Sequence, residues 1–91
     1  MDVRGYETPE EAVLAELDVP RRYFNVVGVR VCGDEAWVYL LTNDRPAYAE
    51  YTCVCFREQG LWTEAYGGSG FSPPVPSEVR QEAERVRSRF R

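Results

Sequence analysis

The chain has 91 residues, with 15 acidic and 11 basic side chains and a net charge of −4. This length makes one domain, and the acidic balance argues against nucleic acid as a partner, because nucleic-acid binders carry a basic surface. Histidine and lysine are both absent, which removes the commonest general base, the commonest zinc ligand and Schiff-base chemistry. We therefore favour a protein that is not an enzyme, and we assign no catalytic residue, no metal ligand and no cofactor.

Three features of the composition bear on where the protein works. No apolar run approaches the roughly 20 residues that cross a bilayer, and no signal-peptide segment follows Met1. The cysteines, Cys32, Cys53 and Cys55, are odd in number, whereas secreted disulfide frameworks are usually even. We therefore expect a cytoplasmic protein with reduced thiols and no membrane partner. Arginine without lysine, and valine and leucine without isoleucine, indicate a G+C-rich bacterial genome.

The first predicted element is a short helix that begins after Thr8. Thr8 stands at the cap position, Pro9 at the first helical position and Glu11 three residues after the cap, which together form a capping box. Val13, Leu14 and Leu17 follow at helical spacing. The run Asp18-Val19-Pro20 ends the helix, because a residue before proline is pushed towards extended geometry.

Two strands come next, joined by a predicted two-residue turn at Gly33-Asp34. The first runs over 27–31 and the second over 35–41. With this turn, one face of the hairpin is wholly aliphatic and pairs Val31 with Ala36, Val29 with Val38, and Val27 with Leu40. The other face pairs Arg30 with Trp37 in a cation–π contact and places Tyr39 over Gly28.

The third and fourth strands are predicted over 48–57 and 61–66, with Glu58-Gln59-Gly60 as a three-residue loop. Both faces of this second hairpin are largely apolar. One carries Thr52, Val54, Phe56, Trp62 and Tyr66, and the other carries Ala49, Tyr51, Cys53, Cys55, Leu61 and Ala65. The sequence pattern does not indicate which of these two faces packs in the core.

A Gly/Pro-rich connector over 67–76 ends the predicted sheet and leads to a last helix. Ser77 caps this helix, which runs to about Phe90 with Val79, Ala83, Val86 and Phe90 in one stripe. The expected fold is therefore α+β, a single domain over 1–91 made of an N-terminal helix, a four-stranded antiparallel meander and a C-terminal helix.

This pattern resembles the cystatin-like folds, and within them the small bacterial nuclear-transport-factor-like proteins. The residues that carry the resemblance are the alternating apolar positions of 29–40 around Gly33-Asp34 and the run Arg57-Glu58-Gln59-Gly60-Leu61-Trp62. It covers residues 8–66. The members of that group that are enzymes use an acidic residue or a His–Asp base in a conical pocket. The resemblance implies the fold and carries no catalytic residue to this chain.

Two sets of residues are candidate chemical sites, one of cysteines and one of carboxylates. Cys53 and Cys55 share a strand face, and Cys32 lies on the first hairpin, so the three thiols would hold zinc or copper(I) only if they converged. We interpret them instead as small buried side chains. Glu50 and Glu64 share a face if the second loop has three residues, which would make a carboxylate pair. We interpret both as solvated strand positions.

The apolar second face of the sheet is the most informative feature. An antiparallel sheet with one solvated face should alternate apolar and polar residues, and this one does so poorly. Its cover is the chain's own C-terminal segment, a second copy of the chain, or another protein. We put a homodimer or another protein first, because Trp, Tyr and Arg are enriched at binding hot spots. The predicted interface residues are Arg30, Trp37, Tyr39, Leu41, Tyr51, Trp62 and Tyr66. The alternative is a small-ligand pocket or minimal enzyme of nuclear-transport-factor-like type that uses Glu50, Glu64 or a tyrosine.

Overall fold

A computed structural model describes residues 5–17, 23–43 and 48–89. The elements follow in the order α1 (Pro9–Glu16), β1 (Phe24–Cys32), β2 (Glu35–Thr42), β3 (Glu50–Glu58), β4 (Leu61–Ser69) and α2 (Ser77–Arg89). The four strands form one antiparallel sheet in the order β1-β2-β3-β4. The predicted α+β fold of a helix, a four-stranded meander and a second helix is confirmed.

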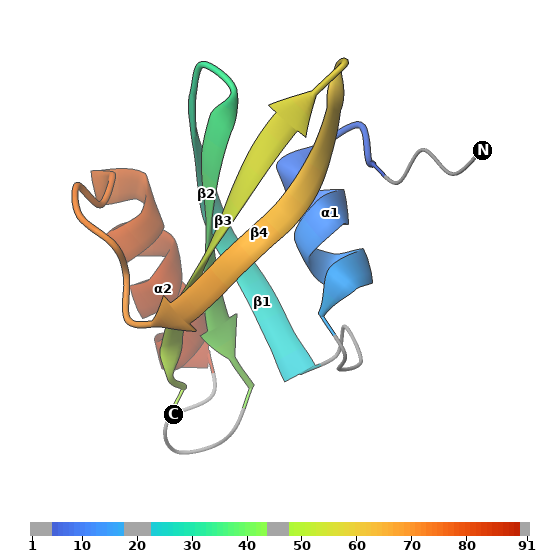
Figure 1. Cartoon of the computed structure of the whole chain (residues 1–91). Coiled ribbons are helices and arrows are strands. Elements are labelled where there is room, and N and C mark those ends of the chain that lie inside the picture. The colour runs from blue at the N-terminus through green and yellow to red at the C-terminus, as the bar shows by residue number, and fades with distance from the viewer. Residues whose placement is uncertain (1–4, 18–22, 44–47, 90–91) are drawn as a thin grey trace.

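The two helices lie on opposite faces of the twisted sheet (Figure 1). We call these the α1 face and the α2 face. Each helix covers one separate core cluster, and the sheet lies between the two clusters. This arrangement explains why both faces of the second hairpin are apolar in sequence, since each face has a helix of its own to pack against.

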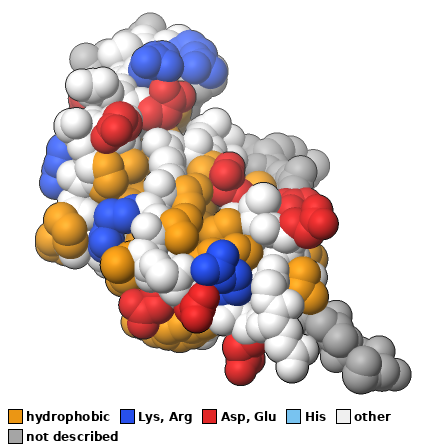
Figure 2. Space-filling view, turned by 90° about the horizontal axis from the view of Figure 1, so that it is seen from above, with side chains coloured by type: hydrophobic (Ala, Val, Ile, Leu, Met, Phe, Trp, Pro, Cys, Tyr) orange, Lys and Arg blue, Asp and Glu red, His pale blue; other side chains and the backbone are white. Residues whose placement is uncertain are grey.

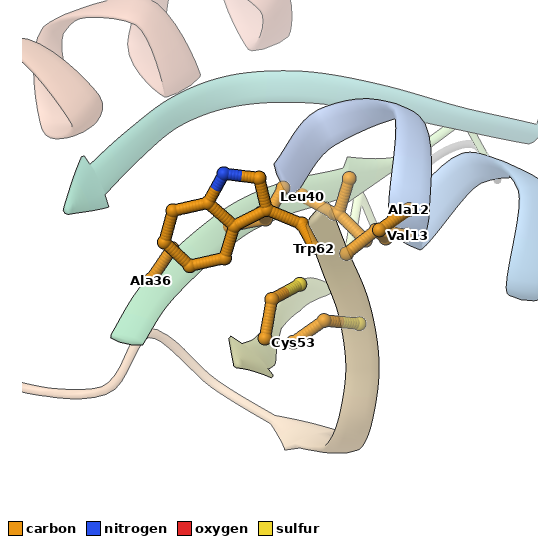
Figure 3. Packing of buried hydrophobic residues seen from close by; sticks show 8 residues of the cluster. Ala12, Val13, Ala36, Leu40, Cys53 and Trp62 are labelled. Atoms are coloured by element: carbon orange, nitrogen blue, oxygen red, sulfur yellow. The ribbon is translucent and has the colours of Figure 1, made fainter. Parts of the chain in front are cut away.

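The α1 face holds the larger cluster. Figure 3 shows Trp62 of β4, Ala36 and Leu40 of β2, and Cys53 of β3 gathered against Ala12 and Val13 of α1. The helix begins as the capping box predicts. Thr8 is extended, its hydroxyl oxygen accepts the backbone N–H of Glu11 at 3.1 Å, and Pro9 follows at the first turn. The predicted helix end at Asp18-Val19-Pro20 lies outside the described residues.

The α2 face holds the second cluster. Val79, Ala83 and Val86 of α2, which form the predicted stripe, pack on Tyr39 and Leu41 of β2. The stripe is confirmed as far as Val86, and Phe90 lies outside the described residues. Ser77 is the first residue of α2 rather than its cap, because the carbonyl of Pro76 already accepts the first helical hydrogen bond, from Arg80.

The first hairpin confirms most of the predicted register. Gly33-Asp34 forms the two-residue turn, with Gly33 at φ 63°, and the pairs Val31–Ala36, Arg30–Trp37, Val29–Val38 and Gly28–Tyr39 are all present. The pairing of Val27 with Leu40 is wrong. A bulge between Val26 and Gly28 makes Val26 the partner of Leu40, and Val27 turns to the α2 face, where it is buried. The bulge thus supplies apolar side chains to both clusters.

The second hairpin has a shorter turn than predicted. Glu58 pairs with Leu61, so the turn consists of Gln59 and Gly60, both with positive φ, at 53° and 80°. Removing one residue from the turn moves every side chain at the start of β4 to the other face. Trp62 therefore lies on the α1 face with the two cysteines, and the three-residue loop is wrong.

Other strand limits also differ from the predicted ones, and β1 begins at Phe24 rather than at position 27. β4 continues through Gly67 and Gly68 to Ser69, so the predicted end of the sheet at Gly67 is wrong. β3 begins at Glu50 rather than at position 48, because Tyr48 has a φ of 42°, which a strand does not accommodate.

Candidate functional site

The predicted contact between Arg30 and Trp37 is present on the α2 face. The guanidinium carbon of Arg30 lies 4.0 Å from the centroid of the Trp37 ring, and Arg30 Nε donates to the hydroxyl of Tyr39 at 3.3 Å. A cation–π contact of this kind contributes about 0.5–1 kcal/mol at an exposed site. The two contacts hold the arginine side chain flat against the sheet.

Tyr39 and Leu41 are covered by the chain's own C-terminal part. Both are completely buried, and Leu41 lies in the cluster under α2. The hydroxyl of Tyr39 reaches the carbonyl oxygens of Ser72 and Pro74, each at 3.2 Å, and Phe71 packs edge-on against its ring. Of the three covers considered for this part of the sheet, the connector and α2 provide it. Neither residue is part of an accessible surface.

Tyr51 and Trp62 lie on the opposite face of the sheet from Trp37. Trp62 is buried among the residues of the α1 cluster, and Tyr51 packs against the edge of that cluster. Arg57 reaches over the indole of Trp62 with its guanidinium carbon 5.0 Å from the ring centroid. The predicted interface residues are therefore divided between two faces. Tyr51 lies on the α1 face by its place in β3, and Trp62 lies there because the two-residue turn at Gln59-Gly60 reverses the orientation of the start of β4.

One part of the α2 face stays uncovered, at the end of the sheet where both hairpin turns lie. Trp37 and Tyr66 lie there in one cross-strand row, on either side of the buried Val54, and Phe56 follows Val54 towards the turn. Tyr66 is 61% exposed, Phe56 is 36% exposed, and Trp37 is half-buried beneath Arg30. We call Arg30, Trp37, Phe56 and Tyr66 the turn-end patch. Figure 2 looks down on this end of the molecule and shows hydrophobic side chains exposed between basic and acidic ones.

Phe56 is the member of the patch that was not among the predicted interface residues. Its position in the same alternating set as Val54 and Tyr66 was the available signal, because residues two apart on a strand share a face. The patch is held rigid from behind by the hairpin turns. Arg57 donates to the Asp34 carboxylate at 3.0 Å and to the Gly33 carbonyl at 3.1 Å, which ties the two turns together.

The three thiols do not converge. Cys32 is exposed near the first turn, whereas Cys53 and Cys55 are buried beneath α1. Burial, with a smaller contribution from the carboxylate of Glu64, raises the pKa of Cys53 from 9.0 to about 12 and that of Cys55 to about 11. Both thiols are therefore protonated and inert at neutral pH.

Glu50 and Glu64 lie on opposite faces of the sheet, so the carboxylate pair is wrong. Glu50 shares the α2 face with Thr52 and forms an ion pair with Arg87 of α2 at 3.1 Å. Glu64 pairs with Cys55 on the α1 face, beside Glu16 of α1. Partial burial, and next the charge of Glu16, raise the pKa of the Glu64 carboxyl above its usual value.

Within residues 5–17, 23–43 and 48–89, neither helix has the length and apolar character to span a membrane. No family model, no curated protein and no solved structure matches this chain. The resemblance to cystatin-like proteins therefore stays a prediction.

Proposed function

We propose that the chain is a non-enzymatic protein-interaction module that docks its partner on the turn-end patch. The observation that carries this proposal is the exposure of Phe56 and Tyr66 beside the Trp37–Arg30 stack, on a part of the α2 face that α2 leaves open. Large aromatic side chains standing open on a small domain mark interaction sites more often than chance surface residues do.

The chemistry of the patch suits a protein partner. Trp, Tyr and Arg are the residues that most often carry binding energy, and clusters of them bind through a few anchored side chains. Arg30 is held in place by Trp37 and Tyr39 before any partner arrives, so less side-chain freedom is lost on binding. The partner we expect has an apolar side chain that packs between Phe56 and Tyr66, and a carboxylate or carbonyl oxygen that accepts from Arg30.

The proposed location is the cytoplasm. The support is the free state of all three cysteines together with the burial of two of them, which suits a reducing compartment.

Site-specific photo-crosslinking in cells tests the docking proposal. A benzophenone amino acid at position 56 should capture one or a few partner proteins, because this ring is exposed at the centre of the proposed surface. The same amino acid at position 31 is the matched control, since Val31 is 53% exposed but belongs to the α1 face of β1. Equal capture from the two positions contradicts the proposal.

The second candidate function is a small-ligand site or minimal enzyme beneath α1, of the kind that the cystatin-like resemblance implies. The raised pKa of Glu64 beside two buried thiols favours it, because a carboxyl that takes up a proton more readily suits acid–base work. In that case Glu64→Gln abolishes turnover or ligand binding. Under the interaction proposal the same change leaves partner binding unaltered.

A further inference from the structure

β4 is an edge strand that is protected over only part of its length. At its start, Trp62 and Tyr6 exchange two backbone hydrogen bonds, of 2.9 and 2.8 Å, so the N-terminal segment covers the edge there. Within the part of the chain that the structure describes, no segment other than β3 pairs with β4 after Trp62. The five residues Ala65–Ser69 are all exposed.

The hydrogen bonds at the end of β4 show which backbone groups point outwards. The N–H of Gly70 donates to the carbonyl of Glu50 on β3 at 2.8 Å. Backbone direction alternates along a strand, so Gly68 and Tyr66 also bond towards β3, while Gly67 and Ser69 direct their N–H and C=O groups away from the sheet. The backbone N–H and C=O groups of these two residues can therefore hydrogen-bond to another strand.

From Tyr66 to Ser69 this edge lacks the usual protection against strand pairing. Natural edges carry charged side chains, proline or bulges that prevent another strand from docking. Ala-Tyr-Gly-Gly-Ser has no charge and no proline, and the bulge of β4 lies at its first residue, Ala65, so Tyr66–Ser69 pair regularly with β3. The opposite edge, β1, has the charge of Arg30, a bulge at Val27 and the packing of α2 on Gly28. β4 is therefore the edge on which a strand can add.

Tyr66 and Gly68 supply a second, independent observation. Both lie on the α2 face, since they pair with Val54 and Thr52. Tyr66 is the most exposed large apolar side chain described, and the place of a Cβ at Gly68 has nothing within 4 Å. An aromatic ring placed across a strand from a glycine covers the bare backbone and stabilises the pair. The ring of Tyr66 would therefore fill the open space over Gly68. Within one chain the two residues lie on the same strand and cannot face each other.

We propose that a second copy of the chain pairs with β4 in antiparallel orientation about a two-fold axis at Gly67. In this register Tyr66 faces Gly68 of the partner subunit, and Ala65 faces Ser69 of the partner subunit. The outward backbone groups of Gly67 bond to those of Gly67 of the partner subunit. The pairing strand belongs to a second copy for two reasons. A two-fold axis makes the contact between Tyr66 of one copy and Gly68 of the other twice, once for each ring. The segment also carries no charge that would repel a second copy of itself.

The register is set by where β4 ends. A two-fold axis at Gly68 would also bring together backbone N–H and C=O groups that point away from β3. It would, however, pair Tyr66 with Gly70 of the partner subunit. Gly70 lies beyond the end of β4, with φ at 86° and its N–H already bonded to Glu50. An axis at Gly67 uses only residues of β4.

This dimer extends the proposed function and rests on it in one respect, because both take the chain to act by binding protein. Two sheets of four strands would join into one of eight, and the two turn-end patches would lie on the same side of it. Tyr66 belongs both to the patch and to the dimer contact. Because five residues of strand bury little area, we expect a dimer that dissociates on dilution.

Disulfide trapping on the full chain tests the pairing and its register. Directly opposed, non-hydrogen-bonded residues of antiparallel strands have Cα atoms about 4.5 Å apart, within disulfide reach. In a Cys32→Ser background, mixing Tyr66→Cys with Gly68→Cys protein under mild oxidation should give a linked dimer about tenfold faster than either protein alone. Gly68→Cys mixed with Val31→Cys is the control. A mixed pair that links no faster than this control overturns the proposal.

Sedimentation of the unmodified chain over a range of concentrations gives a second measurement. We expect a monomer–dimer equilibrium, and Ser69→Pro, which removes an outward N–H without touching β3, should raise its dissociation constant at least tenfold, by about 1.4 kcal/mol. A monomer at every concentration overturns the proposal. Phe56→Ser should leave disulfide trapping unchanged while it weakens the partner of the turn-end patch, so failure of the dimer and failure of the docking surface are told apart.

Discussion

Val79 of α2 packs directly on the backbone of Gly28 in β1, so closely that a Cβ at position 28 would clash with Val79 Cγ2. The glycine lets α2 approach the sheet beside Tyr39 and Leu41, which it then buries. Trp37 packs against the margin of this cluster, whereas Phe56 and Tyr66 lie outside it and are exposed. One close contact therefore decides which part of the aromatic face is core and which part is surface.

Gly28→Ala should displace α2 and destabilise the protein. We expect a loss of about 1–3 kcal/mol in the free energy of unfolding, the usual cost of adding a methyl group to a filled core, measured by urea denaturation at low protein concentration. Gly68→Ala is the control, because the Cβ site at Gly68 is open. Equal losses at the two positions would show that α2 does not pack as described.

The Arg30–Trp37 stack should contribute to stability as a coupled pair. Arg30→Met and Trp37→Leu, separately and together, form a double-mutant cycle in which we expect a coupling energy of about 0.5–1 kcal/mol. Raised salt should weaken it little, because the guanidinium lies against a ring rather than against a carboxylate. A coupling energy of zero contradicts the stacked geometry.

Much of this fold was readable from local rules. The Thr8 cap and the Gly33-Asp34 turn each depend on residues within a few positions of one another, so the sequence predicts them directly. The second turn was misread because Gln59 adopts a positive φ that side chains rarely take, and the one-residue error moved Trp62 to the wrong face.

The remaining errors have a tertiary origin. The bulge at Val27 follows from the need to place apolar side chains under two helices at once, which no window of sequence reports. The interface residues were predicted from an apolar face without knowledge of how far α2 extends over it. That is why Tyr39 and Leu41 were included although they are buried, and why Phe56 was left out.

One thiol of the three should react quickly. Cys32 is exposed, whereas burial protects Cys53 and Cys55 and raises their pKa values to about 12 and about 11. Titration of the native protein with an aromatic disulfide reagent should show one fast equivalent, which Cys32→Ser removes. All three should react at once in denaturant. A second fast equivalent in the native protein would contradict the packing of α1 over the cysteines.

The contribution of Glu64 to stability should fall as the pH rises through the acid range. The pKa of Glu64 is raised in the folded state above its ordinary 4.5 by burial and by Glu16, so the folded protein holds this proton more tightly than the unfolded chain does. The stabilisation is full below the unfolded pKa and is lost as the pH rises through the folded value. Glu64→Gln should therefore flatten this dependence and raise the melting temperature at neutral pH.

The matched control for Glu64 is Glu58→Gln, an exposed position at the end of β3. It measures the effect of removing one exposed carboxylate on the melting temperature, against which the effect of Glu64→Gln is compared. If Glu64→Gln instead leaves the profile as it is, or lowers the melting temperature at neutral pH, the carboxyl is not held in the environment described.

The central claim is that the turn-end patch is a docking surface, and the affinity of the captured partner for patch variants tests it most directly. With the purified partner, Phe56→Ser should raise the dissociation constant at least tenfold, since an anchoring aromatic contributes about 2 kcal/mol or more. Val31→Ser removes an apolar side chain that is more exposed than Phe56 from the other face, and it should change the dissociation constant by less than about twofold. Equal affinities for Phe56→Ser and the unaltered protein would contradict the account.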